Sequence, residues 1–149
     1  MLRICALLAV LLAGSVAAVA AEPEHGSREQ AMAMVKRVEA MFQKDGADAT
    51  FKAVTGKTFN DRDLYPFVYK LDGTDCVAHG ANPAMVGKNL IDLKDQDGKL
   101  LIRELSEVAT KGSGWVDYKW PNPLTKMIDP KSSYVERMGD YFVGVGVYR

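Results

Sequence analysis

The chain has 149 residues, 48% of them hydrophobic, and carries 19 lysines and arginines against 19 acidic residues. This length suits one domain with a substantial core. The basic residues are scattered, which argues against nucleic acid or an anionic membrane surface as a partner, because both require a concentrated basic patch.

The N-terminus has the layout of a secretory signal peptide. Arg3 precedes an apolar run over residues 4–12, and small residues follow as far as Ala20. This run is shorter than the roughly 20 apolar residues that span a bilayer, and the small residues match a peptidase site. We therefore predict a signal peptide over residues 1–20, cleaved after Ala20 or Ala21, and a periplasmic or secreted protein. An uncleaved N-terminal anchor is the alternative.

Cleavage would leave Cys76 as the only cysteine, because Cys5 belongs to the signal peptide. The mature domain then has no intramolecular disulfide. Two interpretations of Cys76 remain open: a buried small hydrophobic residue, or a free thiol that pairs between chains.

Two helices are predicted in the first third of the chain. Ser27 and Gln30 have the spacing of a capping box, so a helix is expected to begin there. Apolar residues then recur at helical spacing until Gly46. They are Ala31, Met34, Val35, Val38, Met41 and Phe42. A shorter helix is expected before Gly56, and the long first helix would allow a homodimer.

A β-hairpin is predicted next. Residues 64–71 are rich in tyrosine, phenylalanine and valine and predict a strand, which turns at Asp72-Gly73 and returns over residues 76–79. Pro66 lacks a ladder donor, so the first strand is expected either to lie at a sheet edge or to be interrupted at that residue. One face of this strand would carry Tyr65, Phe67, Tyr69 and Leu71.

The remainder predicts one more helix and three more strands. The helix is expected over residues 99–111, after a loop, and the strands over residues 115–120, 132–138 and 141–148. Helices ahead of and between meandering strands indicate an α+β domain with an antiparallel sheet of about five strands.

The last predicted strand alternates between bulky and small side chains. Val143, Val145 and Val147 would share one face, while Gly144 and Gly146 fall on the other. Glycines at alternate positions remove side chains from that face and permit a backbone, a helix or a ligand to approach closely.

Catalytic and metal-binding patterns are weak. His79 is the one histidine expected in the folded region, because His25 falls in the predicted N-terminal tail. Cys76 lies three residues before His79 on a predicted strand, so their side chains should point to opposite faces and form no Cys–His pair. Neither Cys76 nor His79 has a second cysteine or histidine at the spacing of a zinc site. The acidic residues of the loop 92–97 do not have the spacing of an EF-hand calcium loop. We therefore expect no enzyme, no metal and no cofactor.

Side chains with a flat apolar body and a polar tip are concentrated in the sheet region, which suits a pocket that orients a small ligand. Lys131 would place a cation beside a carboxylate, whose oxygens tyrosine hydroxyls would hold. The alternative is that the aromatic residues only pack the sheet and Lys131 is solvated. The candidates are Tyr65, Tyr69, His79, Tyr118, Trp120, Lys131, Ser133 and Tyr134.

An ordered set of short motifs resembles the single Cache domain of type 2, over residues 27–149. The motifs are Leu71-Asp72-Gly73, His79-Gly80, Gly87-Lys88-Asn89-Leu90, Asp95-Gln96-Asp97-Gly98, Gly114-Trp115-Val116-Asp117-Tyr118-Lys119-Trp120-Pro121, Pro130-Lys131-Ser132-Ser133-Tyr134-Val135 and Val143-Gly144-Val145-Gly146-Val147-Tyr148. The resemblance implies a long N-terminal helix leading into a PAS-like antiparallel sheet, with a ligand between the sheet and its covering loops and helix.

The resemblance also implies a role. Such domains are the extracytoplasmic sensors of chemoreceptors and histidine kinases, and they often bind small organic acids. The pocket role transfers by resemblance to motif residues and their neighbours. These are Tyr118, Trp120, Lys131, Tyr134, Tyr69, His79 and Arg103.

Family receptors flank the domain with membrane helices, whereas this chain ends one residue past the last predicted strand. We therefore expect a periplasmic module that binds a small organic acid without its own transmembrane or transmitter region. The alternative is an accessory protein that docks on a membrane sensor or respiratory complex without a small ligand, because a fold alone does not fix a function.

Overall fold

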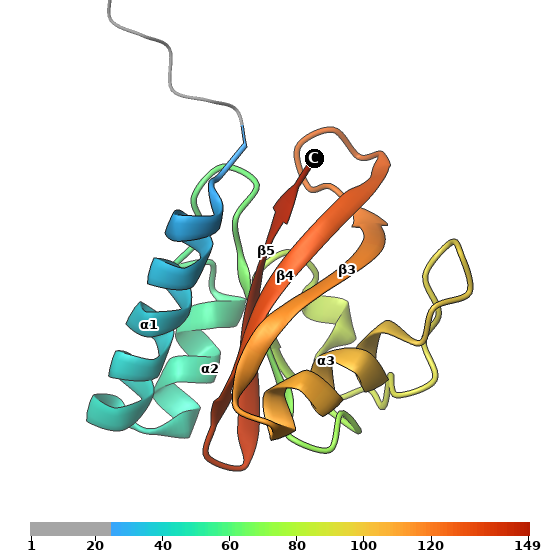
Figure 1. Ribbon diagram of the computed structural model, residues 1–149. Helices are drawn as coiled ribbons and strands as arrows, with labels where there is room; N and C mark the ends of the chain where they lie inside the picture. Colours follow the sequence, from blue (N-terminus) through green and yellow to red (C-terminus); the bar gives the residue numbers. More distant parts are fainter. Residues whose placement is uncertain (1–24) are drawn as a thin grey trace, which may run out of the picture.

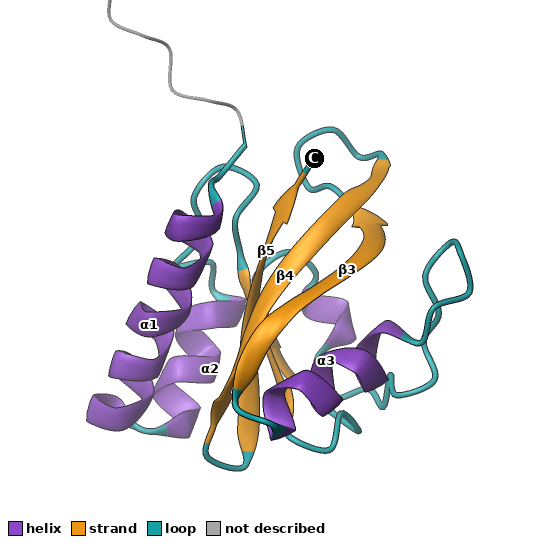
Figure 2. Cartoon of the chain, in the orientation of Figure 1, coloured by secondary structure: helices purple, strands orange, loops and turns teal. Residues whose placement is uncertain are grey.

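One antiparallel sheet separates two helical layers in the computed structural model, which describes residues 25–149 (Figures 1 and 2). The predicted signal peptide lies outside the described residues. The elements are α1 (Arg28–Asp45), α2 (Ala47–Thr55), β1 (Pro66–Lys70), β2 (Cys76–His79), the short 3-10 helix η1 (Pro83–Met85), α3 (Leu101–Thr110), β3 (Ser113–Pro121), β4 (Ile128–Met138) and β5 (Tyr141–Tyr148).

The sheet has five strands in the order β2-β1-β5-β4-β3, and each neighbouring pair is antiparallel. The predicted α+β class is therefore confirmed. α1 and α2 cover one face of the sheet, called here the α1 face, and α3 covers the other, called the α3 face (Figure 1). No helix among residues 25–149 is long and apolar enough to cross a membrane.

Local sequence signals set the boundaries of α1. The Ser27 hydroxyl accepts from the Gln30 amide at 3.2 Å, and the Gln30 side chain accepts from the Ser27 amide at 2.8 Å, which completes the predicted capping box. Gly46 ends the helix with a φ of 83°, a conformation that glycine adopts without strain. The buried residues of α1 face the sheet at the predicted spacing.

The alternation along β5 divides the core between the two faces. Val143, Val145 and Val147 pack into the cluster under α1, whereas Phe142 and Tyr148 join the cluster under α3. The predicted assignment of this strand's faces is confirmed, and the smaller glycine face is the one turned toward α3.

β1 lies between β2 and β5, so it is not an edge strand. Pro66 is its first residue, which is one of the few places where a strand tolerates proline. The strand therefore starts at Pro66, two residues after the predicted start at Leu64, and is neither an edge strand nor interrupted in its interior. β4 begins at Ile128, four residues before the predicted start, because its pairing with β3 continues to the Pro121–Ile128 pair.

A β-bulge changes which face the β2 side chains occupy. Val68 pairs with Ala78 but Tyr69 pairs with Cys76, so Val77 has no partner in the register. The extra residue turns Cys76 to the α3 face, where His79 also lies. The expectation that these two side chains point to opposite faces was wrong, because strict alternation does not continue through a bulge.

Candidate functional site

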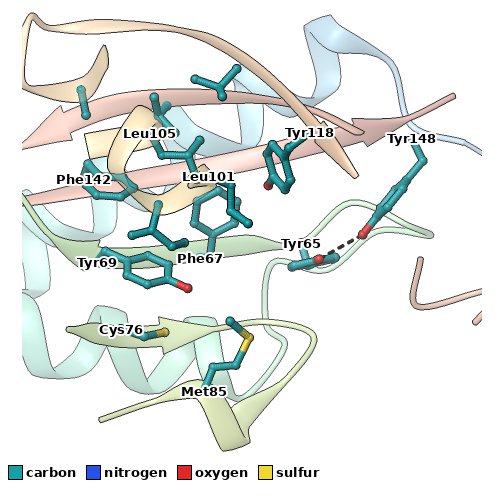
Figure 3. Packing of buried hydrophobic residues seen from close by; sticks show 14 residues of the cluster. Tyr65, Phe67, Tyr69, Cys76, Met85, Leu101, Leu105, Tyr118, Phe142 and Tyr148 are labelled. Atoms are coloured by element: carbon teal, nitrogen blue, oxygen red, sulfur yellow. Dashed lines mark hydrogen bonds between the residues drawn. The ribbon is translucent and has the colours of Figure 1, made fainter. Parts of the chain in front are cut away.

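The α3 face of the sheet contains a small cavity beneath α3. Its free volume is about 10 Å³, close to what one water molecule requires. Figure 3 shows the aromatic side chains that converge there from several strands. The lining residues are Tyr65, Phe67, Tyr69, His79, Leu101, Ile102, Leu105, Tyr118, Trp120 and Lys131. Five of the seven predicted site residues are thus brought together.

Lys131 lies within the sheet, and its side chain is buried. β4 passes between β3 and β5, so Lys131 is paired with Tyr118 on one side and Tyr148 on the other. Its exposed fraction is 1%, and no described carboxylate forms an ion pair with it. The interpretation of Lys131 as a solvated charge is therefore wrong, since the side chain is buried between the flanking strands and α3.

The surroundings of Lys131 weaken its hold on a proton. Burial lowers the pKa of the ammonium group to about 7, and the negative charge of Asp63 acts in the opposite direction. The nitrogen lies 4.1 Å from the ring centroid of Tyr65 and 4.9 Å from that of Tyr148. These ring faces attract a cation but do not neutralise it, so the site is suited to an anion.

A chain of hydroxyl groups begins at Lys131. Its Nζ donates to the Tyr65 hydroxyl at 2.8 Å, and the Tyr65 and Tyr148 hydroxyls are 3.0 Å apart (Figure 3). Tyr148 donates to the carbonyl of Pro121 at 2.8 Å. The chain therefore runs from the cavity to the end of β3.

Gly146 makes room for the lysine side chain. A Cβ at this position would collide with Lys131 Cε and Ser133 Oγ. A Cβ at Gly144 would likewise collide with the Phe67 ring. The alternating glycines do permit a close approach, but the groups that approach are a lysine stem and an aromatic ring and not the expected backbone, helix or ligand.

His79 is held as a neutral ring. Its Nδ1 accepts from the amides of Ala81 at 3.2 Å and Asn82 at 2.9 Å, so the proton of the neutral imidazole is on Nε2. Burial, and then the charge of Lys131, lower its pKa to about 3. His79 therefore offers one hydrogen-bond donor near neutral pH and no base strength.

The remaining predicted residues of the cavity have distinct roles. The Tyr118 hydroxyl and Ser133 Oγ are 2.8 Å apart, and the Trp120 ring meets the Tyr118 ring edge to face. Tyr69 stacks on Phe142, with ring centroids 5.6 Å apart. These contacts fix the walls of the cavity.

Tyr134 and Arg103 do not reach the cavity. Tyr134 lies on the α1 face, where its hydroxyl donates to Glu136 at 2.8 Å. It is three residues from Lys131, and an odd separation on a regular strand reverses the face. Arg103 lies on the exposed side of α3 and pairs with Asp92 at 2.5 Å. For these two residues the predicted grouping was wrong.

Two further features of the site were not predicted. Tyr148 completes the hydroxyl chain. The sequence signal that could have indicated this role is its position on the glycine face of the last strand. Asp63 is fully buried and accepts from His25 Nδ1 at 2.7 Å and the Gly26 amide at 2.8 Å. His25 is thus anchored to the domain and is not part of a free tail, a contact that no local pattern indicates.

These features define a PAS-like sensor fold with a cavity beneath its covering helix. The family model of the single Cache domain 2 matches residues 8–149. The chain belongs to this family, which confirms the resemblance of its ordered motifs.

Two curated relatives are sensory proteins. The sensor histidine kinase MctS of Rhizobium johnstonii is 34% identical over 118 residues, 74% of this chain and 25% of the kinase. The methyl-accepting chemotaxis protein McpP of Pseudomonas putida is 31% identical over 91 residues, 59% of this chain and 16% of the receptor. The chain thus spans a quarter or less of these relatives.

Solved structures share the architecture. A methyl-accepting chemotaxis protein from Vibrio parahaemolyticus superposes with a TM-score of 0.72 at 26% identity, over 81% of this chain and 87% of that one. A periplasmic sensor domain of a chemotaxis protein gives a TM-score of 0.66 at 30% identity, over 80% and 88%. A Cache domain described for carboxylic acid recognition gives 0.62 at 24% identity, over 80% and 86%, a likeness of fold alone.

Proposed function

We propose that this Cache domain is a periplasmic binding module for a small organic acid, whose carboxylate lies beside Lys131. The observation that carries this proposal is a fully buried lysine that no described carboxylate pairs with. An unpaired buried cation is costly, and an anion at its side would remove that cost. The His79 Nε2 proton adds a neutral donor on the same face of the sheet.

The lining sets the class of acid. Leu101, Ile102 and Leu105 of α3 close the cavity with hydrocarbon, so the part of the ligand away from its carboxylate should be short and largely apolar. The free volume of about 10 Å³ means that side chains of α3 must move outward for an acid to enter. Acetate, pyruvate and lactate are the first compounds to test.

Binding rather than catalysis fits the side chains present. Cys76 shares a face with His79, but burial raises the pKa of the thiol to about 11. The pKa of His79 is lowered to about 3, so the pair would have to exchange a proton against both shifts. We therefore propose no thiol-based reaction at this site.

Calorimetry and thermal denaturation with the three acids test the proposal. We expect saturable heats and a raised melting temperature in the wild type, because a ligand that binds only the folded state stabilises it. Lys131→Met should abolish both effects. Lys119→Met is the matched control and should bind normally. Lys119 lies on the neighbouring strand β3, is half-exposed and pairs with Asp97.

A scaffold that docks on a membrane sensor is the second candidate, favoured by the small free volume of the cavity. Absence of binding at millimolar concentrations of all three acids would count against the first proposal. Co-purification of a membrane partner that persists in Lys131→Met would then support the scaffold.

A further inference from the structure

The hydroxyl chain that starts at Lys131 has a fixed direction. The Pro121 carbonyl can only accept a hydrogen bond, so the single hydroxyl proton of Tyr148 is committed to it at 2.8 Å. The Tyr148 oxygen is then the acceptor for the Tyr65 proton at 3.0 Å. The Tyr65 oxygen is therefore left as an acceptor toward Lys131 Nζ at 2.8 Å.

This direction determines what Lys131 can do. An ammonium group only donates, whereas a neutral amine also accepts. Because the proton of Tyr65 points to Tyr148, Tyr65 presents a lone pair to Lys131 and favours its ammonium form. Without the Tyr148 hydroxyl, the Tyr65 proton would be free to turn to the nitrogen of a neutral lysine.

Other polar groups around Lys131 are already engaged. The Tyr118 hydroxyl is bonded to Ser133, and His79 Nδ1 accepts two backbone amides. Asp63 is held by His25 Nδ1 and the Gly26 amide and acts on Lys131 only through its charge. α3 contributes only apolar side chains to the lining. Within the described chain, Tyr65 is thus the hydrogen-bond partner of Lys131.

We propose that Tyr148 is a positioning residue: by committing the Tyr65 proton, its hydroxyl keeps Lys131 a donor toward the bound carboxylate. The inference rests on the proposed function and adds to it a residue at the end of β5, two hydrogen bonds away from Lys131. It also makes the Pro121 carbonyl, at the start of the β3–β4 connection, the group that fixes the polarity of the whole chain.

The decisive measurement needs no ligand. Carbon-13 NMR of labelled lysines reports the protonation of Lys131, with Lys131→Met identifying its signal. In Tyr148→Phe we expect the Lys131 midpoint to fall by about one pH unit, the equivalent of roughly one hydrogen bond to a charged group. Tyr134→Phe, which also removes one tyrosine hydrogen bond but on the α1 face, should leave the midpoint unchanged.

Affinity for pyruvate gives a second readout. A midpoint lowered from about 7 to about 6 reduces the charged fraction at pH 7 about fivefold, so pyruvate affinity should fall about fivefold in Tyr148→Phe. At pH 5.5, where Lys131 is charged in both proteins, the affinities should converge. If Tyr148→Phe only damaged the structure of the site, the loss of pyruvate affinity would persist at both pH values. That result would overturn the proposal.

Tyr65→Phe interrupts the same chain one link nearer to Lys131 and replaces Tyr148→Phe if that variant does not fold. It should also lower the midpoint. An unchanged Lys131 midpoint in the folded variant, or an equal shift in Tyr134→Phe, would overturn the inference. Failure of the wild type to bind any acid would contradict the proposed function, while the ligand-free titration would still decide the role of Tyr148.

Discussion

The ammonium group of Lys131 donates to the hydroxyl of Tyr65 at 2.8 Å and lies 4.1 Å from the centroid of the same ring. One aromatic residue thus supplies both a lone pair and a π face to a buried cation. Neither interaction cancels the charge, so the folded domain is penalised for keeping Lys131 protonated.

The stability of the ligand-free domain should rise with pH above neutrality. The Lys131 pKa is about 7 in the folded protein, whereas the ordinary value for lysine is 10.5, so between these pH values the unfolded chain binds more protons. Each pH unit there should add up to about 1.4 kcal/mol to the free energy of unfolding. Lys131→Met should lack this rise in urea titrations.

The useful window for that comparison is pH 7 to 8.5. Burial raises the pKa of the Cys76 thiol from 9.0 to about 11, and its ionisation in the unfolded chain favours unfolding at higher pH. Parallel pH profiles for the wild type and Lys131→Met would show that Lys131 is not a buried titrating group.

His79 should make the domain sensitive to acid. Its pKa is about 3 in the folded protein, whereas the ordinary value for histidine is 6.5. As the pH falls below 6.5, the unfolded chain therefore binds a proton that the folded ring does not bind. His79→Asn removes the titration while an amide oxygen can still accept from Ala81 and Asn82. The free energy of unfolding should therefore fall less steeply between pH 6.5 and 4 in His79→Asn, and equal slopes would refute the assignment.

Gly146→Ala and Gly144→Ala should both destabilise the fold but differ in their effect on Lys131. Each added Cβ meets a packed side chain, and overpacking of this kind costs about 1–3 kcal/mol. Only the Cβ at Gly146 displaces Lys131, whereas that at Gly144 displaces Phe67. Lysine NMR should show an altered Lys131 titration for Gly146→Ala alone, and a similar alteration in both variants would contradict this difference.

Tyr134→Phe and Arg103→Ala should leave carboxylate affinity within about twofold of wild type. Tyr134 lies across the sheet from the cavity, and the Arg103–Asp92 pair is exposed to solvent, where such pairs contribute little. Calorimetry with pyruvate measures both. A large loss of affinity in Arg103→Ala would show that α3 turns this side chain inward on binding.

Periodicity and capping determined much of the architecture from sequence alone. Ser27 and Gly46 define the ends of α1, and the valine–glycine alternation of β5 assigns its two faces. These signals are local because they depend on helix-end hydrogen bonds and on the two-residue repeat of a strand. The same two-residue repeat places Lys131 and Tyr134 on opposite faces of β4, although the family resemblance assigned both to one pocket.

Only the tertiary structure decided what surrounds Lys131. Its burial depends on β3 and β5 flanking β4, on α3 closing the cavity, and on Tyr65, which is 66 positions away in sequence. The bulge opposite Val68 and Tyr69 places Cys76 on the same face of the sheet as His79. Asp63 binds His25, which is 38 positions away in sequence. A sequence determines such contacts only through the whole packed fold, because desolvation and hydrogen bonding depend on every element that covers a residue.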